Sequence, residues 1–164
     1  MRFDHHKLRI LAAPKGCGAG EQWVREQYAV ELRAHRRRAP NQNVGLLILI
    51  DADRFTVKNR HDQLSRELAH SNQEDRRPNE RIAIWIPSRR IETWVAWLLG
   101  EEVTEQTERR WQITNRDYKR AAARFVELYG QPSDRPSDIL PSITTALEET
   151  GRIDKKERSR PAKK

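Results

Sequence analysis

The sequence predicts an α/β fold, with a small, mostly parallel sheet flanked by helices and followed by C-terminal helices. Three observations lead to this prediction. Short apolar runs alternate with longer segments of helical periodicity up to residue 99. The run at 44–50 is continuously apolar, as in a strand that is buried on both faces. The rest of the chain carries only helical patterns, and strands that alternate with helices form parallel sheets.

The first expected elements are a short strand, a glycine-rich loop and a helix. Residues 8–13 form an apolar run of strand length. The loop at 14–20 contains Lys15, and its glycines would let backbone N–H groups approach a phosphate at the start of a helix. Its spacing matches neither of the common nucleotide-binding glycine motifs, so a plain strand-to-helix turn is an equal alternative. A helix is expected over 21–38, where it ends in the basic stretch Arg33–Arg38.

The middle of the chain is expected to supply the remaining strands. The run at 44–50 is the strongest candidate, and a helix over 57–70 follows it. A polar loop then leads to a second buried strand at 82–86. The next helix, over 91–99, has apolar residues at the spacing of one helical face. Together with 8–13 this gives three strands, which is few for such a sheet.

The C-terminal part is expected to be helical. One helix is predicted over 116–128 and a last helix over about 137–149, each followed by a glycine that ends it. We expect residues 1–151 to form a single domain with one core. We expect residues 152–164 to be a disordered basic tail.

The charge of the chain favours a polyanionic partner such as nucleic acid. The formal net charge is +8 and the isoelectric point about 10.1. Residues 152–164 carry seven Lys and Arg against two acidic residues, so this tail holds +5 of the total. We therefore expect weak nucleic-acid binding through tail cations such as Lys155, Lys156, Arg158 and Arg160. A merely solubilising arm is the alternative.

Composition also predicts the compartment. Cys17 is the only cysteine, so the chain cannot form an internal disulfide or a cysteine-rich zinc site. No apolar run approaches the 18 or so residues of a membrane span. The N-terminal sequence does not have the pattern of a signal peptide. A cytoplasmic protein without a membrane segment is the expectation.

Three carboxylates follow the two buried strands. Asp51 and Asp53 lie two residues apart at the end of the first, where extended residues point to the same side. Glu92 follows the second, and ligands of α/β sheets bind at the carboxyl ends of strands. Oxygen ligands of this kind suit Mg²⁺ or Mn²⁺. The alternative interpretation is structural, with these side chains serving as helix caps or favourable charges at helix N-termini.

Cationic side chains near these carboxylates are candidate phosphate contacts. Arg89 and Arg90 precede Glu92, and Lys15 belongs to the glycine-rich loop. Their alternative role is to balance the charge of the carboxylates.

The strand that ends in Asp51-Ala52-Asp53 and the segment 86–94 around Glu92 together resemble TOPRIM-type domains. The similarity is to proteins of the RloB and OLD nuclease neighbourhood, and it covers about residues 8–99. It implies a metal-dependent nuclease in which Asp51, Asp53 and Glu92 hold the ion and Glu92 is also catalytic. Some of these proteins come from bacterial anti-phage or restriction loci.

One departure from the TOPRIM pattern bears on activity. TOPRIM domains open with a strand that ends in a glutamate, which acts as general acid/base, and we expect this strand and its helix to be absent. Either the start codon is placed too late or the protein is a degenerate member. The hypotheses are thus a Mg²⁺-dependent phosphodiester enzyme, a non-catalytic nucleic-acid-binding or regulatory subunit, and a purely structural partner protein in which the carboxylates act as caps. A sheet edge left open by the missing strand would favour a homodimer or a defence-system partner protein.

Overall fold

The protein is an α/β domain with a two-stranded parallel sheet between two groups of helices. The computed structural model describes residues 8–14, 20–109 and 111–154. No helix in these ranges is long and apolar enough to cross a membrane. The elements in chain order are α1 (Gly20–Arg38), β1 (Leu46–Leu49), α2 (Val57–His70), β2 (Ile82–Trp85), α3 (Ile91–Leu98), α4 (Asn115–Gly130), the 3₁₀ turn η2 (Pro132–Asp134) and α5 (Pro141–Asp154).

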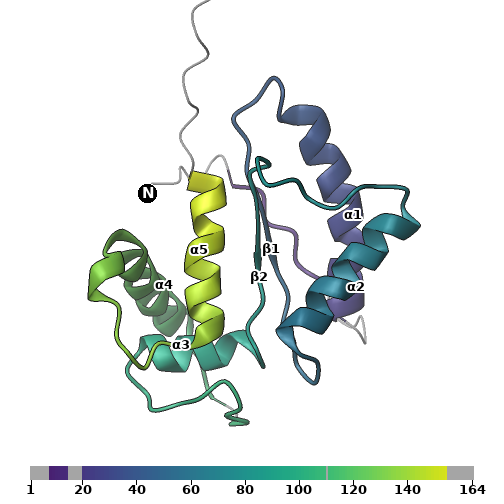
Figure 1. Ribbon diagram of the computed structural model, residues 1–164. Helices are drawn as coiled ribbons and strands as arrows, with labels where there is room; N and C mark the ends of the chain where they lie inside the picture. The colour runs from purple at the N-terminus through teal and green to yellow at the C-terminus, as the bar shows by residue number, and fades with distance from the viewer. Residues whose placement is uncertain (1–7, 15–19, 110, 155–164) are drawn as a thin grey trace, which may run out of the picture.

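The two faces of the sheet are covered by different helices. Figure 1 shows α1 and α2 on one side of the strands and α3, α4 and α5 on the other. Leu46 pairs with Ile82 and Leu49 with Trp85, so the strands are parallel and in register along their length. The α/β architecture with C-terminal helices, expected from the alternation of apolar and helical segments, is confirmed.

Each face of the sheet has its own apolar core. The core under α1 and α2 contains the even-numbered side chains of both strands, and its buried members are Tyr28, Ala29, Leu32, Ile48, Ile50, Ala52, Leu64, Leu68, Ile82, Ile84 and Ile86. The opposite core is aromatic at its centre. There the Trp85 ring lies 4.8 Å from Phe125 and 6.3 Å from Trp94, centroid to centroid. These rings fix α3 and α4 against the end of β2.

The strand expectations need two corrections. Residues 8–14 have no regular secondary structure, and Ile10 is 76% exposed. Apolar composition gives a segment the propensity to form a strand. A strand also needs a neighbouring backbone to pair with, and composition does not supply one. β1 is also not buried on both faces, since Leu47 and Leu49 are 44% and 41% exposed. The physical reason is that α5 packs on β2 and leaves this face of β1 uncovered.

The last helix begins and ends later than predicted. α5 starts at Pro141, a residue suited to a first helical turn, and continues through Gly151 to Asp154. Its final turn is held by arginines, because Arg81 donates to the carbonyl oxygen of Ile153 and Arg152 donates to a carbonyl of β2. The basic tail therefore cannot begin at residue 152. Tail residues 155–164 lie outside the described residues.

The outer edge of β2 is closed by side chains rather than by a strand. Glu149 of α5 accepts a 2.9 Å hydrogen bond from the backbone N–H of Ile84. Arg76 donates to the carbonyl oxygen of Ile82 at 3.0 Å and pairs with Glu149 through both of its terminal nitrogens. These contacts satisfy the edge groups that a neighbouring strand would otherwise use.

Candidate functional site at the carboxyl end of the sheet

The parallel pairing continues past the strand ends and holds the two candidate segments together. Ala52 donates to the carbonyl oxygen of Pro87 at 2.9 Å, and Asp53 donates to that of Arg89 at 3.0 Å. The segment that carries the two aspartates therefore runs beside the segment that leads to Glu92. This arrangement is the one expected from carboxylates that follow neighbouring parallel strands.

Asp51 bridges the end of β1 and the start of α3. Its Oδ1 accepts a 3.0 Å hydrogen bond from the backbone N–H of Ile91. Arg90, at the N-cap position of α3, makes no capping bond with its own side chain, so Asp51 supplies the missing acceptor from another element. The expected capping role is thus real, but the capped helix is α3. The helix that follows β1, α2, is capped by Thr56.

Asp51 and Glu92 interact as like charges. The pKa of Asp51 is raised from 3.8 to about 6, first because the carboxyl is buried and next because the Glu92 carboxylate is close. The hydrogen bond from Ile91 and the positive charge of Arg90 oppose this rise. At neutral pH two negative charges therefore share one half-buried site, an arrangement that a bound cation would relieve.

Asp53 contributes less to this pair. Its backbone has a positive φ of 54°, and its side chain is exposed. It raises the pKa of Asp51 less than Glu92 does. In the described ranges, no group of three or more His, Cys, Asp and Glu side chains is arranged to hold a metal ion. The ligand set of Asp51, Asp53 and Glu92 stays a prediction, and the stronger electrostatic effect of Glu92 on Asp51 favours these two residues.

Two carboxylates are nonetheless enough for a Mg²⁺ site of the common kind. Mg²⁺ keeps several water ligands and is usually held by one or two carboxylates together with the phosphates of a substrate. Ile91 donates to Oδ1 of Asp51, and no residue that the structure describes donates to Oδ2. The donor set of Asp51 and Glu92 therefore fits Mg²⁺ or Mn²⁺.

A buried arginine on α2 supports the segment that carries the two aspartates. The Arg60 side chain on α2 is fully buried, and its guanidinium donates to the carbonyl oxygen of Ala52 at 3.2 Å. The same nitrogen lies 3.0 Å from Glu21 in the first turn of α1, and the other terminal nitrogen bonds Gln63. The guanidinium also lies 5.1 Å from the Phe55 ring centroid. Arg60 thereby ties α1, α2 and the aspartate segment together.

The predicted phosphate contacts differ in how accessible they are. The Arg89 guanidinium donates to the carbonyl oxygen of Asp53 and to Gln106, and it lies 2.9 Å from Glu108. Arg89 therefore braces the site within the protein. Arg90 is exposed next to the carboxylates and is the better placed of the two. Lys15 falls outside the described residues.

Tyr118 is a site residue that sequence reasoning missed. It lies in the first turn of α4, which begins with a reciprocal pair of hydrogen bonds between Thr114 and Asp117. Burial raises the pKa of the Tyr118 phenol, and the negative charges of Glu92 and Asp51 raise it further. The Tyr118 side chain is 40% exposed, and its phenol lies within electrostatic range of the two carboxylates. Tyr118 is 26 residues beyond Glu92, and no motif marks it.

No protein-family model, curated protein or solved structure matches this chain. The resemblance to TOPRIM-type domains thus rests on the motifs of the sequence alone, and it stays a prediction.

Proposed function

We propose that this protein binds Mg²⁺ or Mn²⁺ between Asp51 and Glu92 and acts on the phosphodiester backbone of a nucleic acid, as a metal-dependent nuclease does. The observation that carries the proposal is the pairing of these two carboxylates at the carboxyl end of a parallel sheet, with the pKa of Asp51 raised to about 6. Its support is electrostatic, because like charges in one place favour a divalent cation.

Each residue of the site has a role in this proposal. A bound cation would offset the negative charge of a phosphate and make a bound water more acidic. Asp51 stays oriented by the N–H of Ile91. Exposed Arg90 attracts the phosphate backbone, and the Tyr118 hydroxyl donates a hydrogen bond to a phosphate oxygen.

A second candidate function is nucleic-acid binding without cleavage, as in a regulatory subunit. The specific observation that favours it is the set of protein contacts that already occupies Asp51 and Arg89. Residues engaged in helix capping and loop bracing are less free to serve a reaction. A positioned general acid or base is also needed for efficient hydrolysis.

Cleavage assays distinguish these functions. Labelled single-stranded and duplex DNA and RNA are incubated with the protein in Mg²⁺, in Mn²⁺ and in a chelator. Metal-dependent cleavage that Glu92→Gln abolishes, and that Asp62→Asn on α2 leaves intact, would support the enzyme. Metal-dependent binding without cleavage would support the regulatory subunit. Cleavage of equal rate in Glu92→Gln would refute the proposed site.

A further inference from the structure

Only two aromatic side chains are exposed in the part of the chain that the structure describes, and both lie beside the carboxylate site. Phe55 is 45% exposed and Tyr118 is 40% exposed. The other aromatic rings of residues 20–109 and 111–154 are buried or half-buried. Large apolar side chains that are exposed singly are ordinary, but two aromatic rings at one site indicate a binding surface.

Phe55 is held at this edge by a tight turn that follows β1. Its backbone N–H donates to the carbonyl oxygen of Ala52 at 3.0 Å, and Asp53 within the turn has a positive φ of 54°. The buried Arg60 guanidinium lies 5.1 Å from the ring centroid and supports the ring from inside the protein. A ring that is already fixed in place loses little freedom when another flat group stacks on it.

Tyr118 lies on the other side of the sheet. It belongs to the first turn of α4, whereas Phe55 precedes α2, and Figure 1 shows these two helices on opposite sides of the strands. Besides burial, the negative charges of Glu92 and Asp51 raise the pKa of the Tyr118 phenol, which places the ring within electrostatic range of both carboxylates. The carboxylate site therefore has one exposed aromatic ring on each side.

Exposed cations accompany both rings. One lies directly before Phe55 in the chain, one lies directly after Tyr118, and three more lie at the same edge. None of the five forms an ion pair with a residue that the structure describes. A cation bound by the carboxylates would add to their positive charge, which attracts phosphates. The five are Arg54, Arg90, Arg116, Lys119 and Arg120.

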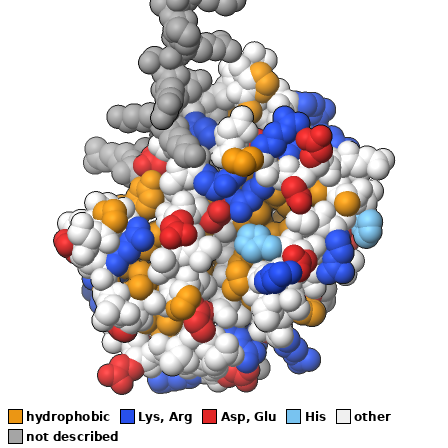
Figure 2. Space-filling view, viewed as in Figure 1, with side chains coloured by type: hydrophobic (Ala, Val, Ile, Leu, Met, Phe, Trp, Pro, Cys, Tyr) orange, Lys and Arg blue, Asp and Glu red, His pale blue; other side chains and the backbone are white. Residues whose placement is uncertain are grey.

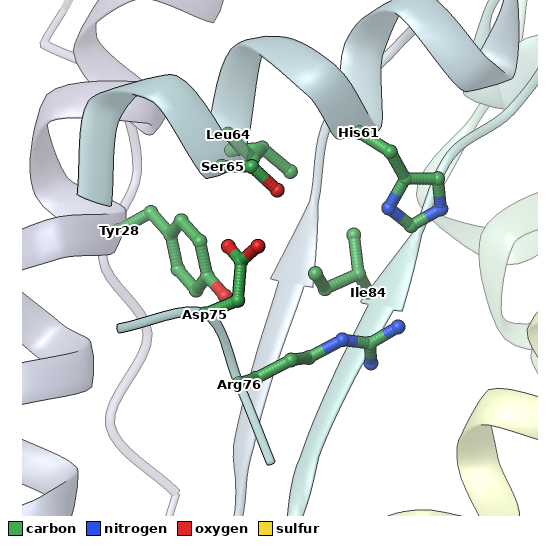
Figure 3. A pocket seen from close by; sticks show the side chains of 7 residues that line it. All are labelled: Tyr28, His61, Leu64, Ser65, Asp75, Arg76 and Ile84. Atoms are coloured by element: carbon green, nitrogen blue, oxygen red, sulfur yellow. The ribbon is translucent and has the colours of Figure 1, made fainter. Parts of the chain in front are cut away.

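The cavity of about 200 Å³ that α1, α2 and β2 line offers no comparable surface (Figure 3). Its aromatic residue, Tyr28, is only 3% exposed. Both terminal nitrogens of Arg76 already donate, to Glu149 and to the carbonyl oxygen of Ile82. Among the described residues, exposed aromatic rings and cations without ion pairs thus occur together at the carboxyl end of the sheet.

We propose that this edge of the protein binds single-stranded nucleic acid, with unpaired bases stacked on Phe55 and Tyr118 and phosphates beside the carboxylate-bound cation. The inference rests on the proposed function, because it names the substrate class of the same site. Stacking on aromatic side chains requires unpaired bases, since a duplex buries their flat faces. Aromatic rings next to cations are the combination with which proteins bind single strands without reading their sequence.

Two single-stranded oligonucleotides of equal length, one with normal bases and one abasic throughout, test the proposal on the whole 164-residue chain. Both carry the same phosphates, so the ratio of their affinities removes the contribution of the basic tail. We expect the normal strand to bind about tenfold or more tightly than the abasic one. Fluorescence anisotropy in a chelator measures both affinities without cleavage. DNA and RNA versions of the strands show which sugar is preferred.

Variants assign this ratio to the two rings. Phe55→Leu and Tyr118→Leu keep an apolar side chain but remove the flat ring, and each should lower the ratio severalfold while binding to a duplex stays unchanged. Tyr118→Phe keeps the ring and should retain the ratio. Val126→Ala is the matched control, because Val126 is an exposed apolar residue further along α4, and it should also retain the ratio.

The contrary outcomes are equally clear. Equal affinity for the normal and the abasic strand, a ratio that survives both leucine variants, or equal losses in Tyr118→Leu and Val126→Ala would each overturn the proposal. If Phe55→Leu does not fold by circular dichroism, Tyr118→Leu alone decides. Glu92→Gln should keep the ratio, so loss of metal-dependent cleavage in that variant leaves this inference intact. Cleavage without any base preference would refute the stacking surface and leave the proposed function intact.

Discussion

The Asp51 carboxylate accepts a hydrogen bond from the backbone N–H of Ile91, forty residues further along the chain. This contact gives one side chain two roles. It caps the N-terminus of α3, and it places a negative charge beside Glu92, which is a residue of that helix. The surface of Figure 2 mixes cationic and anionic side chains closely, without a single large basic patch on that face. On this face, recognition of a polyanion would therefore depend on local features.

Divalent metal should stabilise the folded protein. A cation between Asp51 and Glu92 removes a like-charge repulsion, and a ligand that binds only the folded state raises the melting temperature. We expect millimolar Mg²⁺ or Mn²⁺ to raise the midpoint of thermal unfolding, and Glu92→Gln to lose this rise. An equal rise in Glu92→Gln would place the metal elsewhere. Asp62→Asn is the control, and it should respond as the unaltered protein does.

The stability of the protein should depend on pH through the titration of Asp51. The folded-state pKa is about 6 against 3.8 for the ordinary carboxyl. Because the folded pKa is raised, the stabilising effect of this group is complete below pH 3.8 and is lost as the pH rises through 6. The cost of ionised Asp51 at neutral pH is on the order of 3 kcal/mol.

Asp51→Asn isolates this effect, because asparagine keeps an oxygen acceptor for Ile91 but carries no charge. The difference in the free energy of unfolding between Asp51→Asn and the unaltered protein should grow in favour of the variant as the pH rises from 4 to 7. Urea titrations in a chelator measure it. A difference that is constant across this range would show that Asp51 titrates normally.

Removal of the Arg60 side chain should destabilise the protein severely. Arg60→Ala leaves Glu21 and the carbonyl oxygen of Ala52 without their partner and empties a fully buried space. Because Glu21 is 37% exposed and can be solvated, the loss comes mainly from the emptied space and the unpaired carbonyl oxygen, and we expect about 2–5 kcal/mol. Urea unfolding followed by tryptophan fluorescence measures the loss. Arg66→Ala on the exposed face of the same helix should have little effect, and a similar loss in both variants would contradict the role assigned to Arg60.

Substitution of Glu149 should destabilise the protein more than substitution of its neighbour Glu148. Glu149→Ala removes the acceptor of the Ile84 N–H and leaves Arg76 without its carboxylate. We expect a loss of about 2–4 kcal/mol in the free energy of unfolding. Glu148 is exposed on α5, and Glu148→Ala should change this free energy by less than about 0.5 kcal/mol. Denaturant titration of both variants checks the difference.

Binding to nucleic acid should weaken steeply with salt, and the tail should account for part of this dependence. Residues 155–164 contain six Lys and Arg, each of which can displace a counterion from the phosphate backbone. Truncation after Asp154, which keeps α5 whole, should lower both the affinity and the slope of log K against log salt concentration. Fluorescence anisotropy with a labelled oligonucleotide provides the measurement. An unchanged slope would assign binding to the folded domain.

The sequence predicted those parts of the fold that depend on local chemistry. α2 has the bounds expected, because Thr56 supplies a cap and the apolar spacing that follows is helical. The aspartate segment and Glu92 lie next to one another because parallel strands end at the same edge. Local patterns could not show that α5 leaves Leu47 exposed, since this depends on where a distant helix packs.

The candidate site was predicted only in outline for a similar reason. A charged residue such as Arg60 is expected at the surface, and its burial depends on partners from two other elements. The same holds for Arg89, whose partners come from the connector before α4. Tyr118 reaches the site through the packing of α4 on α3. Interactions of this kind become visible only when the elements are assembled.

The closure of β2 by α5 has a consequence for how the chain acquires its structure during synthesis. The N–H of Ile84 finds its acceptor in a residue that the ribosome adds 65 positions later. Until α5 emerges, both edges of the nascent sheet are open to other chains. We infer that early termination within α5 would yield a product prone to aggregation and proteolysis, even though it would contain every residue of the carboxylate site.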